Sequence, residues 1–160
     1  MGIRIALVVF VSAALAGGCA NAQEVSVDAA RAAVAACLDS AGPTLAEREA
    51  CADVYLSPCM EQPGGDTTYG MIACTGAEYE AWDEILNDRY GQLREAWPEG
   101  AFEALREAQG AWLAWREAEC DIETAMFEGG TLARVTRAMC MNTMTAERAV
   151  KLDDMLSWLP

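Results

Sequence analysis

The stretch "CDIETAMFEGGTLARVTRAMC", residues 120–140, decides the fold of this chain. Two adjacent glycines, Gly129 and Gly130, separate segments whose apolar residues recur every three or four positions, the spacing of an amphipathic helix. Glycine tolerates the left-handed backbone at which helices commonly end. Cys120 and Cys140 each lie ten positions from Gly130. Because residues equidistant from the turn of an antiparallel hairpin face one another, we predict a disulfide between these two cysteines.

The helical spacing continues on both sides of this hairpin and predicts an all-α, disulfide-stapled bundle with two long antiparallel hairpins. One long helix is expected from about residue 68 to 97, and "PEG" at 98–100 separates it from a second helix that ends at Gly129. Thr131 is expected to cap the last helix. The predicted core stripes of the three helices are Tyr79, Trp82, Leu86, Tyr90, Leu93 and Trp97, then Phe102, Leu105, Gln109, Trp112, Arg116 and Cys120, then Leu132, Val135, Met139, Leu152 and Leu156.

Two shorter helices are expected ahead of these. The first follows Ser26 and runs to about Leu38. The second follows Thr44 in "TLAE", where Glu47 stands three residues after a capping threonine, the signature of a capping box. We expect it to end before Pro58, because proline interrupts a helix interior.

The N-terminus has the pattern of a secretory signal. Arg4 precedes an uncharged apolar run, residues 5–15, which has the length of a signal-peptide core and is too short to span a bilayer. "ANA" predicts cleavage after Ala22, which makes residues 1–22 the signal peptide, whereas "AGGC" offers the alternative of a lipoprotein anchored at Cys19. We therefore expect a periplasmic or secreted protein, and no later run is long and apolar enough to span a membrane.

Either route leaves six of the seven cysteines, and an even number in an oxidising compartment favours disulfides over metal sites. Proximity pairs Cys37 with Cys51 and Cys59 with Cys74. Each pair closes a short loop, for which a disulfide contributes about 3 kcal/mol. Four cysteines allow three pairings, so crossed connectivity among these four stays open.

The composition excludes several classes of function. Without residues 1–22 the chain has 10 basic and 25 acidic residues, a net charge of −15, which disfavours nucleic acid and anionic membranes as partners. The charge either serves solubility or attracts a strongly basic protein. The sequence contains no histidine, so imidazole bases and ligands are absent. Carboxylates alone could perform acid–base chemistry, but so many acidic residues form pairs by chance that we predict no enzyme and no cofactor or metal site.

Several polar residues occupy core-facing helical positions. We interpret them as a structural network that fixes helix register rather than as a ligand site. Counting outward from the turn at Glu99 places Asp83 close to Arg116 and predicts an ion pair between the two long helices. The predicted network comprises Glu78, Asp83, Asn87, Gln109, Arg116, Thr145 and Arg148.

The pieces "EYEAWDEILNDRYGQL" (78–93), "LREAQGAWLAWREAEC" (105–120) and "EGG" (128–130), followed by Cys140 and Leu152, resemble the LprI-type lysozyme-inhibitor domain over roughly residues 59–156. The resemblance implies a small exported helical domain, in a family with at least one described lysozyme inhibitor. It divides the mature chain into an N-terminal disulfide-bonded helical extension, 23–58, and the recognised domain, 59–160, packed as one unit. The family's recurrent residues correspond to Asp83, Leu86, Asn87, Tyr90, Gln109, Trp112, Arg116, Cys120, Gly129, Gly130, Cys140, Thr145 and Arg148.

Two functional hypotheses follow. The first is an acidic binding protein that blocks a basic lysozyme-type glycosidase, and the second is a structural or accessory envelope protein without inhibitory activity. An inhibitory element has to be rigid and protruding, because a flexible element loses conformational entropy when it becomes ordered on binding. The loop closed by Cys59 and Cys74 is the first candidate, with Glu61, Asp66 and Tyr69 as contact residues. The hairpin tip, Glu128 to Thr131, is the second candidate, with Glu128 as its contact residue.

Overall fold

A computed structural model describes residues 25–158 of the chain, so the expected signal peptide, residues 1–22, and Cys19 lie outside the described residues. The described part is helical and contains no strand, which confirms the all-α prediction. The helices are α1 Val27–Ser40, α2 Leu45–Glu49, α3 Leu56–Met60, α4 Thr68–Ala96, α5 Glu99–Met126 and α6 Thr131–Leu156.

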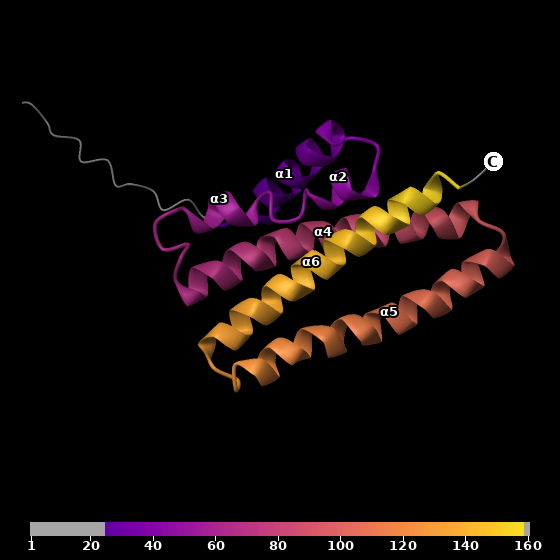
Figure 1. Cartoon of the computed structure of the whole chain (residues 1–160). Helices are drawn as coiled ribbons and strands as arrows, with labels where there is room; N and C mark the ends of the chain where they lie inside the picture. The colour runs from indigo at the N-terminus through magenta and orange to yellow at the C-terminus, as the bar shows by residue number, and fades with distance from the viewer. Residues whose placement is uncertain (1–24, 159–160) are drawn as a thin grey trace, which may run out of the picture.

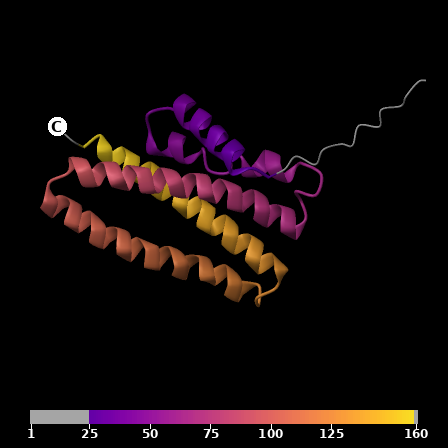
Figure 2. The same ribbon diagram turned by 180° about the vertical axis from the view of Figure 1, so that it is seen from behind.

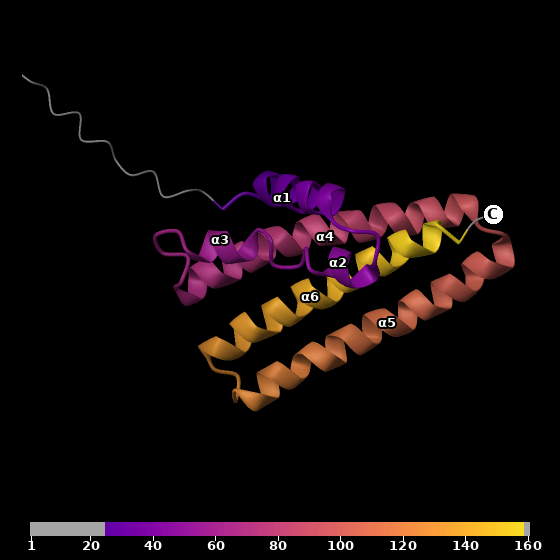
Figure 3. The ribbon, with the colours of Figure 1, turned by 45° about the horizontal axis from the view of Figure 1, so that its top comes forward.

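The three long helices are not arranged in the order of the chain. α4 and α5 run antiparallel from the turn that joins them, but they diverge, and α6 packs between them against both (Figure 1). The view from behind shows the same divergence (Figure 2). α1 and α3 lie on α4 and α2 lies on α6, on the side away from α5 (Figure 3). α5 therefore contacts the rest of the fold mainly through α6.

The core forms where α4, α6 and α1 meet. Trp82 and Leu93 from α4 and Leu152 from α6 are fully buried, as is Val34 from α1. By contrast, α5 buries only a narrow stripe, Leu105, Gln109, Arg116 and Cys120. The predicted stripes of α4 and α5 thus face inward, although much of the stripe on α5 is polar.

Several helix ends differ from the predictions. The expected second helix is two short ones, α2 and α3, and Pro58 lies in the first turn of α3, where its missing N–H breaks no intrahelical hydrogen bond. The cap of α6 is Gly130 without a side-chain hydrogen bond, so the expectation for Thr131 is wrong. Leu132 is 49% exposed rather than in the core, because Ala133 faces inward in its place, whereas Val135 is buried as predicted. The capping box between Thr44 and Glu47 is present, and it lowers the pKa of Glu47.

Three disulfides staple the helices: Cys37–Cys51, Cys59–Cys74 and Cys120–Cys140. These are the pairs that proximity and the hairpin symmetry favour, and the crossed connectivity is not seen. Between residues 25 and 158, no helix has the length and apolarity needed to cross a membrane.

Candidate functional site

A buried carboxylate holds the segment before α3 against α4. Glu78 on α4 is fully buried. Its Oε1 accepts a hydrogen bond from the backbone N–H of Asp53 (2.6 Å), and its Oε2 accepts from the backbone N–H groups of Tyr55 (2.9 Å) and Leu56 (2.6 Å). Hydrogen bonds to an ionised acceptor are stronger than those between neutral groups. Asp53 has a left-handed backbone, φ 68°, a strained conformation that these bonds help to hold.

Two side chains complete the surroundings of this carboxylate. Trp82 Nε1 donates to Glu78 Oε1 at 3.2 Å, and Asn142 Nδ2 lies 3.4 Å from the same oxygen. Asn142 is fully buried on α6 and also donates to Asp53 Oδ1 at 3.3 Å. The predicted network omitted Asn142, although it continues the stripe of α6 three residues after Met139 and could have been found from that spacing.

A second polar cluster lies where α5 packs against α6. Arg116 is 6% exposed, and its Nη1 donates to Thr145 Oγ1 at 2.9 Å. Arg148 Nε donates to Gln109 Oε1 at 2.8 Å. The guanidinium carbons of Arg116 and Arg148 lie 4.8 Å and 5.6 Å from the ring centre of Trp112, within the range of cation–π attraction. Burial lowers the pKa of Arg148 below its ordinary value.

The predicted ion pair between Asp83 and Arg116 does not form. Asp83 Oδ2 accepts a hydrogen bond from Asn87 Nδ2 at 2.8 Å, one turn along α4, and Asn87 is exposed rather than in the core. The carboxylate nearest to Arg116 is that of Glu117, 3.6 Å from Nη2. The physical reason is the position of α6, which separates the two helices that sequence counting had placed face to face.

Because α4 and α5 diverge, an open groove lies between them. Four residues of the predicted network come together at this groove, namely Asp83 and Asn87 from α4 and Gln109 and Arg116 from α5. The groove has a volume of about 310 Å³. Glu78, Thr145 and Arg148 do not line it, so the predicted network is divided between this groove and the interior.

The loop closed by the Cys59–Cys74 disulfide is tightly folded against the start of α4. A β-carbon on Gly70 would come within 2.1 Å of the carbonyl oxygen of Gly64, so only glycine allows this close approach. Thr67 caps α4 by accepting from Gly70 N at 3.0 Å and donates to Gly64 O at 2.7 Å. The three contact residues proposed from sequence, Glu61, Asp66 and Tyr69, are all exposed, and Tyr69 is 85% exposed.

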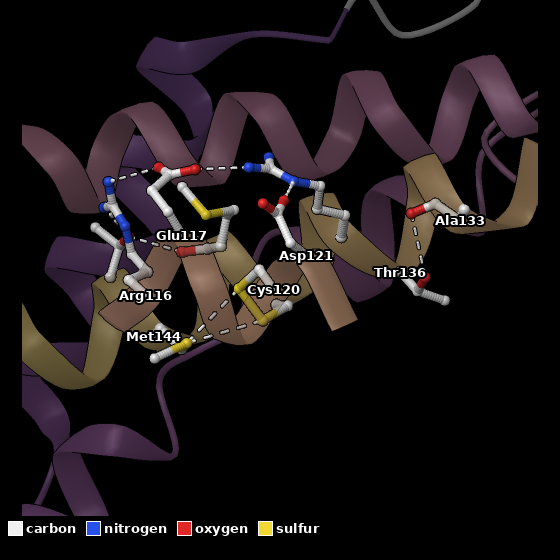
Figure 4. The surroundings of a disulfide bond; sticks show 11 residues. Arg116, Glu117, Cys120, Asp121, Ala133, Thr136 and Met144 are labelled. Atoms are coloured by element: carbon white, nitrogen blue, oxygen red, sulfur yellow. Dashed lines mark hydrogen bonds and ion pairs between the residues drawn. A yellow bond between two sulfur atoms is a disulfide. The ribbon is translucent and has the colours of Figure 1, made fainter. Parts of the chain in front are cut away.

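The tip of the α5–α6 hairpin is stapled below its turn. Met144 Sδ lies 3.6 Å from the sulfur of Cys120, beside the disulfide (Figure 4). Arg137 on α6 donates to Asp121 Oδ1 (2.8 Å) and Glu117 Oε2 (2.6 Å) on α5, and the bond to Asp121 raises the pKa of Arg137 above its ordinary value.

Beyond the staple, the tip is open to solvent. Glu128, the second predicted contact residue, is exposed and has φ 51°. Sequence reasoning did not single out the exposed apolar side chains near it, Ile122, Met126 and Phe127, which lie off the core stripe of α5.

The fold and these clusters define a small disulfide-stapled helical domain whose buried polar residues tie helices together. The family model described as "Lysozyme inhibitor LprI" matches residues 59–152, and the chain belongs to this family. It is also similar to the "Uncharacterized protein R02472" of Rhizobium meliloti (strain 1021), with 27% identity over 97 residues, which cover 52% of this chain and 69% of that protein. No solved structure matches. Residues 25–58, with α1 and α2, precede the part that matches the family.

Proposed function

We propose that this protein binds and inhibits a basic lysozyme-type glycosidase, and that the loop closed by Cys59 and Cys74 makes the contact. Membership of the lysozyme-inhibitor family supports the class of partner. The observation that carries the choice of surface is the rigidity of this loop together with the 85% exposure of Tyr69. A loop that is already ordered loses little entropy on binding, and exposed tyrosines are enriched at protein interfaces.

The charge of the surrounding chain supports the same choice. No lysine or arginine occurs between Arg48 and Arg89, whereas this interval contains nine acidic residues, among them Glu61 and Asp66. Glu61 and Asp66 form none of the ion pairs found between residues 25 and 158. An uncompensated negative surface steers a basic partner toward it and disfavours acidic partners.

The test compares two double variants that remove the same charge from different places. Glu61→Gln with Asp66→Asn changes the loop, whereas Glu107→Gln with Glu119→Gln changes two exposed α5 carboxylates that lie in no ion pair of the described chain. Both reduce the net negative charge by two, so both slow association equally if charge acts only at long range. We expect the loop variant to weaken inhibition of a basic muramidase at least about tenfold more than the α5 variant, about 1.4 kcal/mol.

The salt dependence of the binding rates separates long-range electrostatic steering from direct contact. As ionic strength rises from about 10 mM to 150 mM, the Debye length falls from about 30 Å to 8 Å, so the association rate should fall steeply and the dissociation rate much less. An equal loss of inhibition in the two double variants would mean that the loop does not make the contact. Glu128→Gln then tests the hairpin tip. If the wild-type protein does not slow any basic muramidase at low salt, the protein is instead a structural or accessory component of the envelope.

A further inference from the structure

The groove between α4 and α5 has the size and composition of a small-ligand site. Its volume of about 310 Å³ lies at the lower end of the range of about 300–1,000 Å³ that is common for such sites. Tyr90, Leu86 and Leu113 supply apolar surface, and Asp83 and Asn87 supply hydrogen-bonding groups. The groove exists because α6 keeps the two helices apart, so it is a consequence of the fold rather than of a mobile segment.

Arg116 lines this groove with an incomplete set of partners. Its Nη1 bonds Thr145 and its Nη2 lies 3.6 Å from Glu117, but its buried Nε has no hydrogen-bond partner within residues 25–158. A buried donor without a partner is destabilising, because it has given up its hydrogen bonds to water. Unpaired buried donors are uncommon in folded proteins, and one that borders a groove is a feature that a bound acceptor would relieve.

The positive charge here is concentrated in an otherwise acidic protein. Arg106, which forms an ion pair with Glu103, also lines the groove, and Arg116 and Arg148 both pack on the ring of Trp112. Arg148 Nη2 is also buried without a partner in the described part of the chain, and Arg148 forms no ion pair there. Two partly unsatisfied guanidinium groups therefore pack on one indole ring, and this ring and Arg116 line the groove.

Gly110 gives independent support for an open site. It lies in the interior of α5, where glycine is less favourable than alanine because it loses more backbone entropy on folding. A β-carbon at this position would meet no atom within 4 Å, so no packing contact requires glycine. Gly110 lines the groove, and its missing side chain leaves room for a ligand against the helix.

We propose that this groove binds a small carboxylate-bearing ligand, with Arg116 receiving the carboxylate. Asp83, on the opposite wall, accepts a hydrogen bond from an N–H or O–H group near that carboxylate, and Tyr90 contacts the apolar part. The ligand chemistry is that of an N-acylated amino acid, as at the end of a peptide, or of a sugar acid. This site is separate from the loop of the proposed inhibitory contact and does not depend on it.

The experiment is an NMR titration of the ¹⁵N-labelled mature protein at constant ionic strength. The probes are N-acetylalanine and glucuronate, with N-acetylalaninamide and glucose as their uncharged counterparts. We expect at least one acid to shift the Trp112 indole and Gly110 amide signals saturably, with a Kd of about 1 mM, and neither neutral counterpart to do so. Saturable shifts with N-acetylalanine alone identify peptide carboxylates as the ligand class, and saturable shifts with glucuronate alone identify sugar acids. Saturable shifts with both show that the carboxylate itself is what the groove recognises.

Gly110 provides the variant and its control, because replacing the buried Arg116 would also damage the fold. Gly110→Glu introduces a carboxylate into the groove, whereas Gly110→Gln introduces a neutral side chain of the same size, so Gly110→Glu should bind at least about tenfold more weakly than Gly110→Gln. The proposal is overturned if neither acid produces a saturable shift, if the neutral probes shift the same signals equally, or if Gly110→Glu binds as tightly as Gly110→Gln.

Discussion

Replacing Glu78 by glutamine should destabilise the protein more than any other isosteric change of an acidic residue. The carboxylate accepts backbone hydrogen bonds with both oxygens, from Asp53 on one and from Tyr55 and Leu56 on the other. An amide keeps one oxygen and turns an NH₂ donor toward the remaining N–H groups. At least one backbone donor then loses its partner, and the surviving bonds are no longer charge-assisted.

The expected loss follows from these contacts. One unsatisfied buried donor costs about 1–3 kcal/mol, and a hydrogen bond to a charged group is worth more than a neutral one by about 1 kcal/mol, so Glu78→Gln should lose about 2–4 kcal/mol. That is a large share of the roughly 5–15 kcal/mol typical of a folded domain. Urea unfolding of the oxidised protein gives the free energy, and hydrogen exchange should show faster exchange at Asp53, Tyr55 and Leu56.

The control is Glu80→Gln, two residues along the same helix on its exposed side, which should change stability by less than about 0.5 kcal/mol. A loss below about 1 kcal/mol for Glu78→Gln, or unchanged exchange at the three amides, would refute the reasoning. Either result would mean that the segment before α3 is held by its disulfide and apolar contacts instead.

Three further outcomes are expected. Replacing Cys120 and Cys140 by serine should cost about 3 kcal/mol in urea unfolding, because the bond closes a 20-residue separation, and a loss near zero would contradict a role in holding the hairpin. Thr44→Ala should cost about 1 kcal/mol through loss of the capping box, and Thr44→Ser, which keeps the hydroxyl, should cost much less. Arg31 hydrogen-bonds Glu84 and lowers the pKa of this carboxyl, so the stabilisation by the pair is present above pH 4.5 and is lost as pH falls below that value. The stability difference between the wild type and Glu84→Gln should therefore shrink in acid. A difference that grows in acid would contradict the pairing.

The sequence was sufficient to locate the three long helices and insufficient to predict how they pack. Apolar spacing located the three long helices and the inward side of Arg116, because a helix phase depends only on residues close in the chain. The partner of Arg116 depends on which helices meet, and counting from a turn assumes that chain neighbours pack together. α6 packs between α4 and α5, so Arg116 bonds Thr145 rather than Asp83.

The same limit applies to the candidate sites. The tight loop and its disulfide follow from local glycines and cysteine proximity, and both could be anticipated from the sequence. The groove could not, since it arises from the angle between helices that are separated by a third. The role of Glu78 was only half anticipated: its burial follows from its place on α4, whereas its backbone partners Asp53 to Leu56 come from an irregular segment that has no periodic signal.

The position of α6 also dictates the order in which the chain can assemble. During synthesis, which proceeds from the N-terminus, α4 and α5 are complete before residues 131–156 have been made. α4 and α5 make few contacts with each other. The core therefore cannot form until α6 has been synthesised, and the Cys120–Cys140 disulfide cannot form until α6 packs antiparallel to α5. A truncated chain that ends before α6 should therefore remain unfolded and sensitive to protease, and the final fifth of the sequence commits the whole molecule to its native state.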